Sequence, residues 1–518
     1  MNGAEALLQT LCDCGIDVCF ANPGTSEMQL VAAIDQKPGM RAILGLFEGV
    51  VTGAADGYGR MADKPAATLL HLGPGLANGL ANLHNARRAR TPLVNVVGDH
   101  AGDHLKYDAP LTSDIEGVAR PMSDWVRTST SPEGLAVAGA EAVEAALVYP
   151  GQVATLIVPA DHAWTDGARP VPPGDRPAVP RVSGKAIAEA AAILKQEGSA
   201  ALFLGGMALR EEALLQAGRI AAATGARLIC ETFTARLQRG AGRVAVERLP
   251  YFGEMAAELL KDLDRIVFVG ARPPVSFFAY PGKPGWLSPA GADLVELAGP
   301  REDALGTLRG LADELDAPGS PACLQTKLAP PIPQGKLDAQ SVGAVLAALL
   351  PEDAIVSDEA ATASLAILPM TQGAARHDWL MLTGGSIGQG LPLAAGAAVA
   401  CPDRKVIALQ ADGSGMYTVQ ALWTMARENL DVTTIVLNNG SYAILNIELA
   451  RVGVAAPGPK ALSLLDLTRP AIDWVAISNG MGVAAVSADT VQGFQQALRE
   501  ALASKGPRLI EAIIPAAA

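Results

Sequence analysis

Residues 406–445 read VIALQADGSGMYTVQALWTMARENLDVTTIVLNNGSYAIL, and this stretch decides the fold. An apolar run ends just before Asp412, a helical pattern follows, and a second apolar run ends at Asn439. The pattern predicts a strand, a helix and a second, parallel strand. Polar residues then stand at the carboxyl ends of both strands, where parallel sheets bind ligands. The segment therefore predicts a ligand site in an α/β domain.

The polar groups at this edge suit a divalent cation that also holds a diphosphate. Asp412 supplies a carboxylate and Asn439 an amide oxygen, and a backbone carbonyl lies nearby in sequence. These are the hard oxygen ligands that an octahedral Mg²⁺ takes. The Gly413-Ser414 turn begins a helix, and the free backbone N–H groups of a helix start attract phosphate.

The same alternation of strand and helix patterns runs along all 518 residues. Short apolar runs such as ATLLHL, VATLIVP and RIVFVGA are each followed by Ala- and Leu-rich helical stretches. This rhythm predicts parallel sheets with helices on both faces. Two proline-rich stretches, 168–184 and roughly 317–336, interrupt it as linkers. We expect three doubly wound α/β domains, over residues 1–167, 184–316 and 336–518.

Charge and composition exclude several classes of protein. The net charge is −13, and no run of Lys and Arg occurs, so neither nucleic acid nor an anionic membrane is an expected partner. No apolar run reaches the length of a membrane span. There is no P-loop, and no GxGxxG opens a helix after the first strand, so neither a P-loop enzyme nor a nicotinamide-dependent dehydrogenase is expected. Six cysteines without a CxxC pair and a start without a basic leader predict a cytoplasmic protein with free thiols.

A second informative segment is ILGLFEGVVTGAADGYGRMA, residues 43–62. Glu48 follows an apolar strand and begins a helix of small residues. An acidic residue at a helix start is ordinarily explained by the helix dipole.

Together these segments resemble the thiamine diphosphate-dependent enzymes. The family motif, GDG followed some 27 residues later by NN, matches Asp412 and Asn439, which are 27 positions apart. Ala411 replaces the first glycine, a change that a negative φ would tolerate. The family pattern E-x-x-A-x-x-A-A-x-G-Y-A-R is followed by Glu48, Gly57 and Arg60, among others. The resemblance extends to Asn22-Pro23-Gly24-Thr25, to HLGPGLANGLANLHNA and to LTGGSIGQGLPLAAGAA (382–398).

The resemblance implies thiamine diphosphate and Mg²⁺ as cofactors. Asp412, Asn439 and the carbonyl of Ser441 would be the metal ligands. Glu48 would hydrogen-bond the aminopyrimidine ring as a buried acid. Ile387 would be the wedge that bends the cofactor, and the Gly385 carbonyl would accept from its 4′-amino group. The other cofactor-binding residues implied are Gly413, Ser414, Tyr442 and Ala443.

Within the family, three features resemble benzoylformate decarboxylase. His71 matches that enzyme's active-site His and would relay protons, while Thr25 stands where it has a Ser that binds the substrate carboxylate. The third is the ADGSGMYTVQALWTMARENL segment. The decarboxylase's second His is absent, and Phe277 and Phe278 stand there instead. The substrate residues implied are Gly24, Thr25, His71, Phe277, Phe278, Ala361 (a Thr in the decarboxylase) and Leu445.

We therefore expect a non-oxidative decarboxylase of an aromatic or branched 2-oxo acid, acting through a C2 carbanion and an enamine. One alternative is a carboligase of the acetolactate synthase type, because GPGLAN resembles that enzyme's GPGATN. However, Asp99 replaces its Gln, and the chain is short for full flavin contacts, so FAD is not expected. A second alternative is a non-catalytic paralogue. The family implies a homodimer at minimum, usually a homotetramer, with the site between two subunits.

Overall fold

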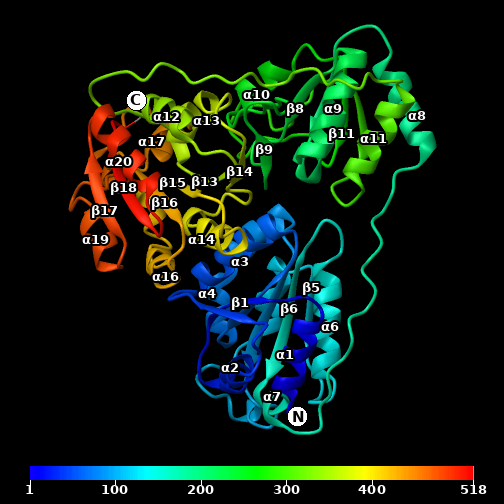
Figure 1. The fold of residues 1–518 in the computed structure, drawn as a ribbon, viewed down its shortest axis with the longest axis vertical. Coiled ribbons are helices and arrows are strands. Elements are labelled where there is room, and N and C mark those ends of the chain that lie inside the picture. Colours follow the sequence, from blue (N-terminus) through cyan, green and yellow to red (C-terminus); the bar gives the residue numbers. More distant parts are fainter. Residues whose placement is uncertain (517–518) are drawn as a thin grey trace.

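The computed structural model describes residues 1–516, and its elements form three parallel-dominated sheets with helices packed against them. In Figure 1 the first sheet and its helices lie below, the second lies at the upper right, and the third at the upper left. Two long connecting segments join them along the outside of the molecule. The expected α/β fold class is confirmed.

The first sheet is entirely parallel, with the order β2-β1-β3-β4-β6-β5. Its strands are β1 (Val18–Asn22), β2 (Arg41–Leu44), β3 (Ala66–Leu70), β4 (Leu93–Asp99), β5 (Trp125–Thr128) and β6 (Val153–Pro159). Its helices are α1 (Gly3–Asp13), α2 (Met28–Asp35), α3 (Glu48–Ala62), α4 (Leu72–Ala89), α5 (Ile115–Ala119), α6 (Leu135–Ala146) and α7 (Ala160–Trp164).

The central sheet is also parallel, with the order β10-β8-β7-β11-β12. Its strands are β7 (Ala200–Leu204), β8 (Arg227–Cys230), β10 (Glu247–Arg248), β11 (Arg265–Val269) and β12 (Asp293–Ala298). Its helices are α8 (Gly184–Leu194), α9 (Glu211–Thr224), α10 (Gly253–Leu260) and α11 (Ala304–Glu314).

The third sheet has the order β17-β18-β16-β15-β13-β14-β9. Its strands are β13 (Ala354–Glu359), β14 (His377–Met381), β15 (Val406–Ala411), β16 (Val432–Asn438), β17 (Ala484–Ala488), β18 (Arg508–Ile513) and the antiparallel edge strand β9 (Leu237–Arg239). Its helices are α12 (Ala339–Leu349), α13 (Ser364–Met370), α14 (Gly390–Ala400), α15 (Asp412–Gly415), α16 (Ala421–Arg427), α17 (Ala443–Arg451), α18 (Pro459–Ser463), α19 (Trp474–Gly480) and α20 (Val491–Ala503).

Strand β9 is the one strand that does not join the sheet of its sequence neighbours. It falls between the central strands β8 and β10 in sequence, yet it pairs with β14 of the third sheet. The central segment therefore extends across to the third unit.

The first and third units share one hydrophobic core, built largely on helices α3 and α14 (Figure 1). Helix α14 is apolar all round, and all but its last residue are buried, as expected for a helix enclosed by protein. A Cβ on Gly57 would overlap the backbone of Leu393, and one on Gly396 would overlap the backbone of Ala54. Glycine at both positions thus lets the two helix backbones approach closely.

A buried ion pair in α3 joins all three units. Arg60 donates two hydrogen bonds to Asp56, at 2.8 and 2.6 Å, and both side chains are excluded from solvent. Arg60 also donates to the carbonyls of Ala235 and Met381. The carboxylate of Asp56 accepts a further bond from Gln389. Because these partners come from all three units, the pair sets how they pack.

We expect Asp56→Ala to destabilise the protein by about 3–5 kcal/mol, because it leaves the Arg60 guanidinium buried and uncompensated. The urea midpoint followed by circular dichroism measures the loss. Glu189→Ala is the control, since its pair with Lys185 is exposed and should be worth less than about 1 kcal/mol. Equal midpoints for the two variants would contradict the structural role of the pair.

Candidate cofactor and substrate site

Three predicted site residues follow neighbouring strands of the first sheet. Thr25 follows β1, Glu48 follows β2, and His71 follows β3. Because β1 lies between β2 and β3 and all three strands are parallel, their carboxyl ends meet at one edge of the sheet. The structure thus brings the three residues to the edge where such sheets bind ligands.

His71 is held by a carboxylate that sequence reasoning missed. Its Nδ1 lies 2.7 Å from Oε2 of Glu27, whose side chain is fully buried. Glu27 also accepts hydrogen bonds from the Gly24 backbone N–H at 2.7 Å and from the Ser26 hydroxyl at 2.6 Å. A Cβ on Gly24 would overlap the His71 ring. Gly24, Glu27 and His71 therefore form one packed unit, beside which Thr25 is exposed.

Glu48 begins helix α3 and is buried, with 8% of its surface exposed. The side-chain amide of Asn78 donates to Oε2 of Glu48 at 3.0 Å. A Cβ on Gly75 would lie 3.2 Å from Oε1 of Glu48 and 3.3 Å from Cβ of His71. Oε1 of Glu48 and Cβ of His71 thus lie next to the same glycine.

The second half of the site lies at the carboxyl edge of the third sheet. Strands β15 and β16 are parallel neighbours, and Asp412 and Asn439 directly follow their ends. Oδ2 of Asp412 accepts from the Gly440 backbone N–H at 2.8 Å, which joins the two parts of the motif. Ala411, which replaces the family's glycine, has φ −73°. An alanine adopts this conformation without strain.

The residues around Asp412 fit a divalent cation. Asp412 is buried, and burial raises the pKa of its carboxyl group above the ordinary value despite hydrogen bonds from backbone N–H groups. No Lys or Arg among residues 1–516 pairs with it. A buried carboxylate without a basic partner is stabilised by a bound cation. In the adjoining turn, Oδ1 of Asn439 accepts from the Ser441 N–H at 2.9 Å.

The remaining predicted cofactor residues surround this turn. Ser414 lies in the short helix α15, and its hydroxyl accepts from Gln410 at 2.6 Å. A Cβ on Gly413 would overlap the ring of Tyr442, so glycine allows this close packing. Ala443 is buried at the start of α17.

The predicted wedge segment is clamped from two sides. Asn82 and Asn85 of α4 donate to the carbonyls that flank Ile387, those of Gly388 at 3.2 Å and Ser386 at 2.7 Å. From the other side, Glu359 accepts the N–H of Gly388 at 2.6 Å and that of Gly390 at 2.5 Å. Ile387 is thereby held on a turn with little freedom, as a wedge requires.

The predicted substrate residues lie around these elements. The Phe277 ring occupies the space that a Cβ on Gly385 would need, and its centroid is 4.9 Å from that of Phe278. Ala361 begins a 3₁₀ turn, with φ +52°, that contacts helix α17. Leu445 is on that helix. These four residues are exposed in the single chain.

Five residues described above were not predicted from sequence: Glu27, Asn78, Asn82, Asn85 and Glu359. Glu27 gives a local signal, because a Glu three positions after the cap residue Gly24 fits a capping box. Asn78 and Glu359 give none. The partner of Asn78 is Glu48, 30 positions away, and the partners of Glu359 lie 29 and 31 positions away.

Across residues 1–516 no hydrogen bond links Glu48, Thr25 or His71 to Asp412 or Asn439.

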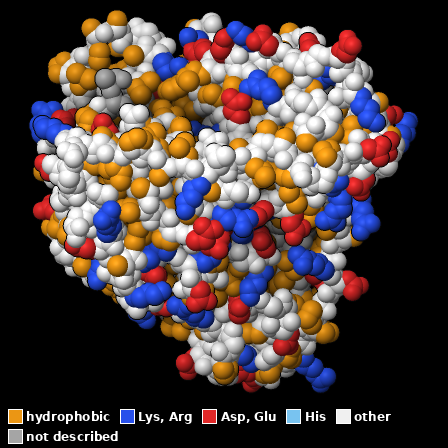
Figure 2. Space-filling model, turned by 45° about the horizontal axis from the view of Figure 1, so that its top comes forward, with side chains coloured by type: hydrophobic (Ala, Val, Ile, Leu, Met, Phe, Trp, Pro, Cys, Tyr) orange, Lys and Arg blue, Asp and Glu red, His pale blue; other side chains and the backbone are white. Residues whose placement is uncertain are grey.

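None of the helices among residues 1–516 is long and apolar enough to span a membrane. On the face drawn in Figure 2, Lys and Arg side chains are interspersed with Asp and Glu.

Comparisons with known proteins show the family of the chain. Residues 1–118 match the thiamine pyrophosphate enzyme, N-terminal TPP binding domain, and residues 364–512 match the C-terminal TPP binding domain. The chain is 55% identical over 516 residues to "Putative acetolactate synthase large subunit IlvX" of Mycobacterium tuberculosis, covering 99% of both chains. It is 31% identical to benzoylformate decarboxylase of Pseudomonas aeruginosa, over 96% of both.

Among solved structures, the chain is similar to the thiamine diphosphate-dependent 4-hydroxybenzoylformate decarboxylase of Rhodococcus jostii RHA1. The TM-score is 0.87, with 26% sequence identity over 99% of both chains. The chain belongs to the thiamine pyrophosphate enzyme family. It is a thiamine diphosphate-dependent enzyme of the group that contains the 2-oxo acid decarboxylases and acetolactate synthases.

We expect Gly24→Ala to lower activity while leaving stability nearly unchanged. The backbone at Gly24 is extended, with φ −118°, so alanine adds no backbone strain, but its methyl group would displace the His71 ring. Turnover should fall by about tenfold or more, as for a misplaced proton-transfer group. Gly184→Ala, where a Cβ meets nothing, is the control. Wild-type turnover in Gly24→Ala would show that the ring's position is unimportant.

We also expect Glu359 to make stability depend on pH. Burial raises the pKa of its carboxyl group to about 7, from 4.5. The folded protein therefore holds this proton more tightly than the unfolded chain. Its contribution to stability is complete below about pH 4.5 and is lost as the pH rises through about 7. The thermal midpoint should fall less between pH 5 and 8 in Glu359→Gln than in wild type. The exposed-site variant Glu352→Gln should keep the wild-type slope, and an unchanged slope in Glu359→Gln would refute the assignment.

Proposed function

We propose that the chain is a thiamine diphosphate- and Mg²⁺-dependent non-oxidative decarboxylase of an aromatic or branched 2-oxo acid. The observation that carries this proposal is the position of His71. Its ionisable ring is hydrogen-bonded to the buried Glu27, and its Cβ lies, like Oε1 of Glu48, next to Gly75. A decarboxylase that releases an aldehyde needs a proton donor at this place.

Residues at the carboxyl edge of the third sheet would bind the cofactor and its metal ion. Asp412, Asn439 and the carbonyl of Ser441 would hold Mg²⁺, and backbone N–H groups near Gly413 would meet the diphosphate. When bound, the cofactor supplies a carbon nucleophile and the electron sink for the bond to CO₂. The chain's own part is to orient that group between Ile387 and the Gly385 carbonyl.

Residues of the first unit would transfer the protons. Glu48 would hold a proton at the aminopyrimidine ring, with Asn78 fixing its other oxygen. His71, oriented by Glu27, would give a proton to the product carbon. The exposed Thr25 hydroxyl is available to the substrate carboxylate.

The proposed substrate side chain follows from the residues that the family resemblance places around the substrate. Phe277, Phe278, Ala361 and Leu445 are all apolar, so they favour an aromatic or branched group over a polar one. Their exposure in the single chain suits a site completed by a second subunit. A homodimer, with the first unit of one subunit facing the third unit of another, is the minimum; a homotetramer is proposed.

A carboligase of the acetolactate synthase type is the second candidate. The 55% identity to a relative that carries that name favours it. Carboligation requires room and a polar grip for a second 2-oxo acid, whereas His71 serves protonation. A non-catalytic paralogue is disfavoured, because burying Glu48 and Asp412 without basic partners is costly and benefits only a working site.

Products identify the reaction. Purified protein with thiamine diphosphate and Mg²⁺ should convert benzoylformate to benzaldehyde and CO₂, identified by mass spectrometry. With His71→Ala, aldehyde release should slow by about 10²–10⁴-fold, and the share of carboligation products should rise. His162→Ala is the matched control, since the His162 ring bonds the Ser129 hydroxyl, which belongs to no part of the proposed site. Acetolactate from pyruvate, with no benzaldehyde, would replace the proposal with the synthase.

A further inference from the structure

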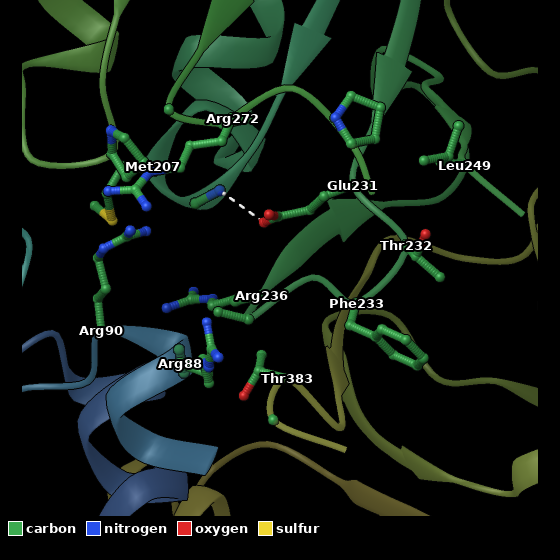
Figure 3. A pocket seen from close by; sticks show the side chains of 18 of the residues that line it. Arg88, Arg90, Met207, Glu231, Thr232, Phe233, Arg236, Leu249, Arg272 and Thr383 are labelled. Atoms are coloured by element: carbon green, nitrogen blue, oxygen red, sulfur yellow. Dashed lines mark hydrogen bonds between the residues drawn. The ribbon is translucent and has the colours of Figure 1, made fainter. Parts of the chain in front are cut away.

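A pocket of about 720 Å³ lies between the edges of two sheets. Strand β10 is the edge of the central sheet, and β9 is the edge of the third sheet. Both strands line the pocket, and so does helix α13 of the third unit. The cleft drawn in Figure 3 is a different one, because it shares only Pro250 and Tyr251 with this pocket.

Each of the two edge strands ends in an arginine that lines the pocket. Arg239 is the last residue of β9, and Arg248 is the last residue of β10. Nη2 of Arg239 donates to the Leu368 carbonyl at 2.9 Å, and Nη1 of Arg248 donates to the Thr232 carbonyl at 3.1 Å. Within residues 1–516 their other guanidinium nitrogens donate to no oxygen, and neither group forms an ion pair. Both guanidinium groups therefore retain donors for a ligand.

The charge around these two groups is positive. Burial and the neighbouring Arg248 lower the pKa of Arg239 to about 10, and burial also lowers the pKa of Arg248. Asp358 opposes both shifts, but its carboxylate accepts from the Trp379 indole and the Ser364 hydroxyl rather than from either arginine. Two guanidinium groups near one carboxylate leave one positive charge, which a ligand with one negative charge would balance.

The rest of the lining is mostly apolar. Phe252 and Met255 come from the start of α10, Leu365 comes from α13, and further leucine and valine side chains come from β8, β9 and the segment before β10. Met255 is 57% exposed and Leu365 42%. The two other charged residues of the lining, Arg227 and Glu247, pair with each other at 2.6 Å. An apolar group bound here would remove exposed apolar surface from water, which is favourable.

We propose that this pocket binds a small monocarboxylate with an apolar side chain. The carboxylate would accept hydrogen bonds from Arg239 and Arg248, because the paired N–H donors of a guanidinium match the two oxygens of a carboxylate. The apolar side chain would lie against Phe252, Met255 and Leu365. The volume of the pocket falls in the range of small-molecule sites, about 300–1,000 Å³. The site does not depend on the proposed reaction.

Calorimetric titration of the holoenzyme with octanoate tests the site, with pH and ionic strength held constant. Three further probes each lack one feature of the proposed ligand. Butyrate has a shorter side chain, octan-1-ol has no charge, and inorganic phosphate has no side chain. Octanoate should bind about tenfold or more tightly than butyrate, because it buries four more methylene groups. It should also bind more tightly than octan-1-ol or phosphate.

Two variants each alter one part of the site. Arg248→Gln should weaken octanoate binding by about tenfold or more, because it removes charge-assisted hydrogen bonds. Met255→Glu should also weaken it, because it places a charge against the apolar side chain. Since Met255 is exposed, this variant keeps the test valid even where Arg248→Gln fails to fold. Arg219→Gln is the matched control, because Arg219 bonds Gln216 and two carbonyls outside the pocket.

The proposal is supported if Arg248→Gln and Met255→Glu lose octanoate binding and Arg219→Gln retains it. Binding that persists in both pocket variants would place octanoate elsewhere in the protein and overturn the proposal. Octan-1-ol binding as tightly as octanoate would overturn it by showing that the arginines are not used. Phosphate binding as tightly as octanoate would overturn it by showing that the apolar lining is not used, and the absence of octanoate binding would also overturn it.

Discussion

The guanidinium of Arg60 is the point at which the three units of the chain meet. It is neutralised by Asp56 on the same helix, and its remaining N–H groups reach carbonyls of the central and third units. Such a group cannot be left unpaired in a dry interior, so neighbouring segments must supply acceptors at fixed positions. This constraint places helix α3, and Glu48 is the first residue of that helix.

The packing of α3 also positions other residues of the candidate site. Gly57 and Gly396 bring α3 and α14 into backbone contact, and the turn just before α14 carries Ile387. Asn82 of α4 bonds both the Gly49 carbonyl and the Gly388 carbonyl, so the start of α3 and the wedge turn share one donor. The positions of Glu48 and Ile387 are therefore set by the same packing.

The fold was predictable because its signals are local. Strand and helix periods, two proline-rich linkers and the Asp412–Asn439 motif each lie within one stretch of sequence. Strand β9 was not predictable, since three residues give no period and its partner β14 lies 138 positions away (377 against 239). Glu359 was missed for the same reason: a carboxylate at a strand end resembles many others until the Gly388 and Gly390 N–H groups are seen to converge on it.

The buried carboxyl groups of the chain differ in whether their hydrogen-bond donors are charged or neutral. Asp56 is buried beside the Arg60 guanidinium and accepts hydrogen bonds on both oxygens, so its charge and its hydrogen-bonding capacity are satisfied within the chain. Glu48, Glu359 and Asp412 are buried with amide and backbone N–H donors only. Neutral donors offset less of the cost of a buried charge than a cation does. Among residues 1–516 the carboxyl groups of Glu48, Glu359 and Asp412 thus have no cationic partner, whereas the charge of Asp56 is neutralised by Arg60.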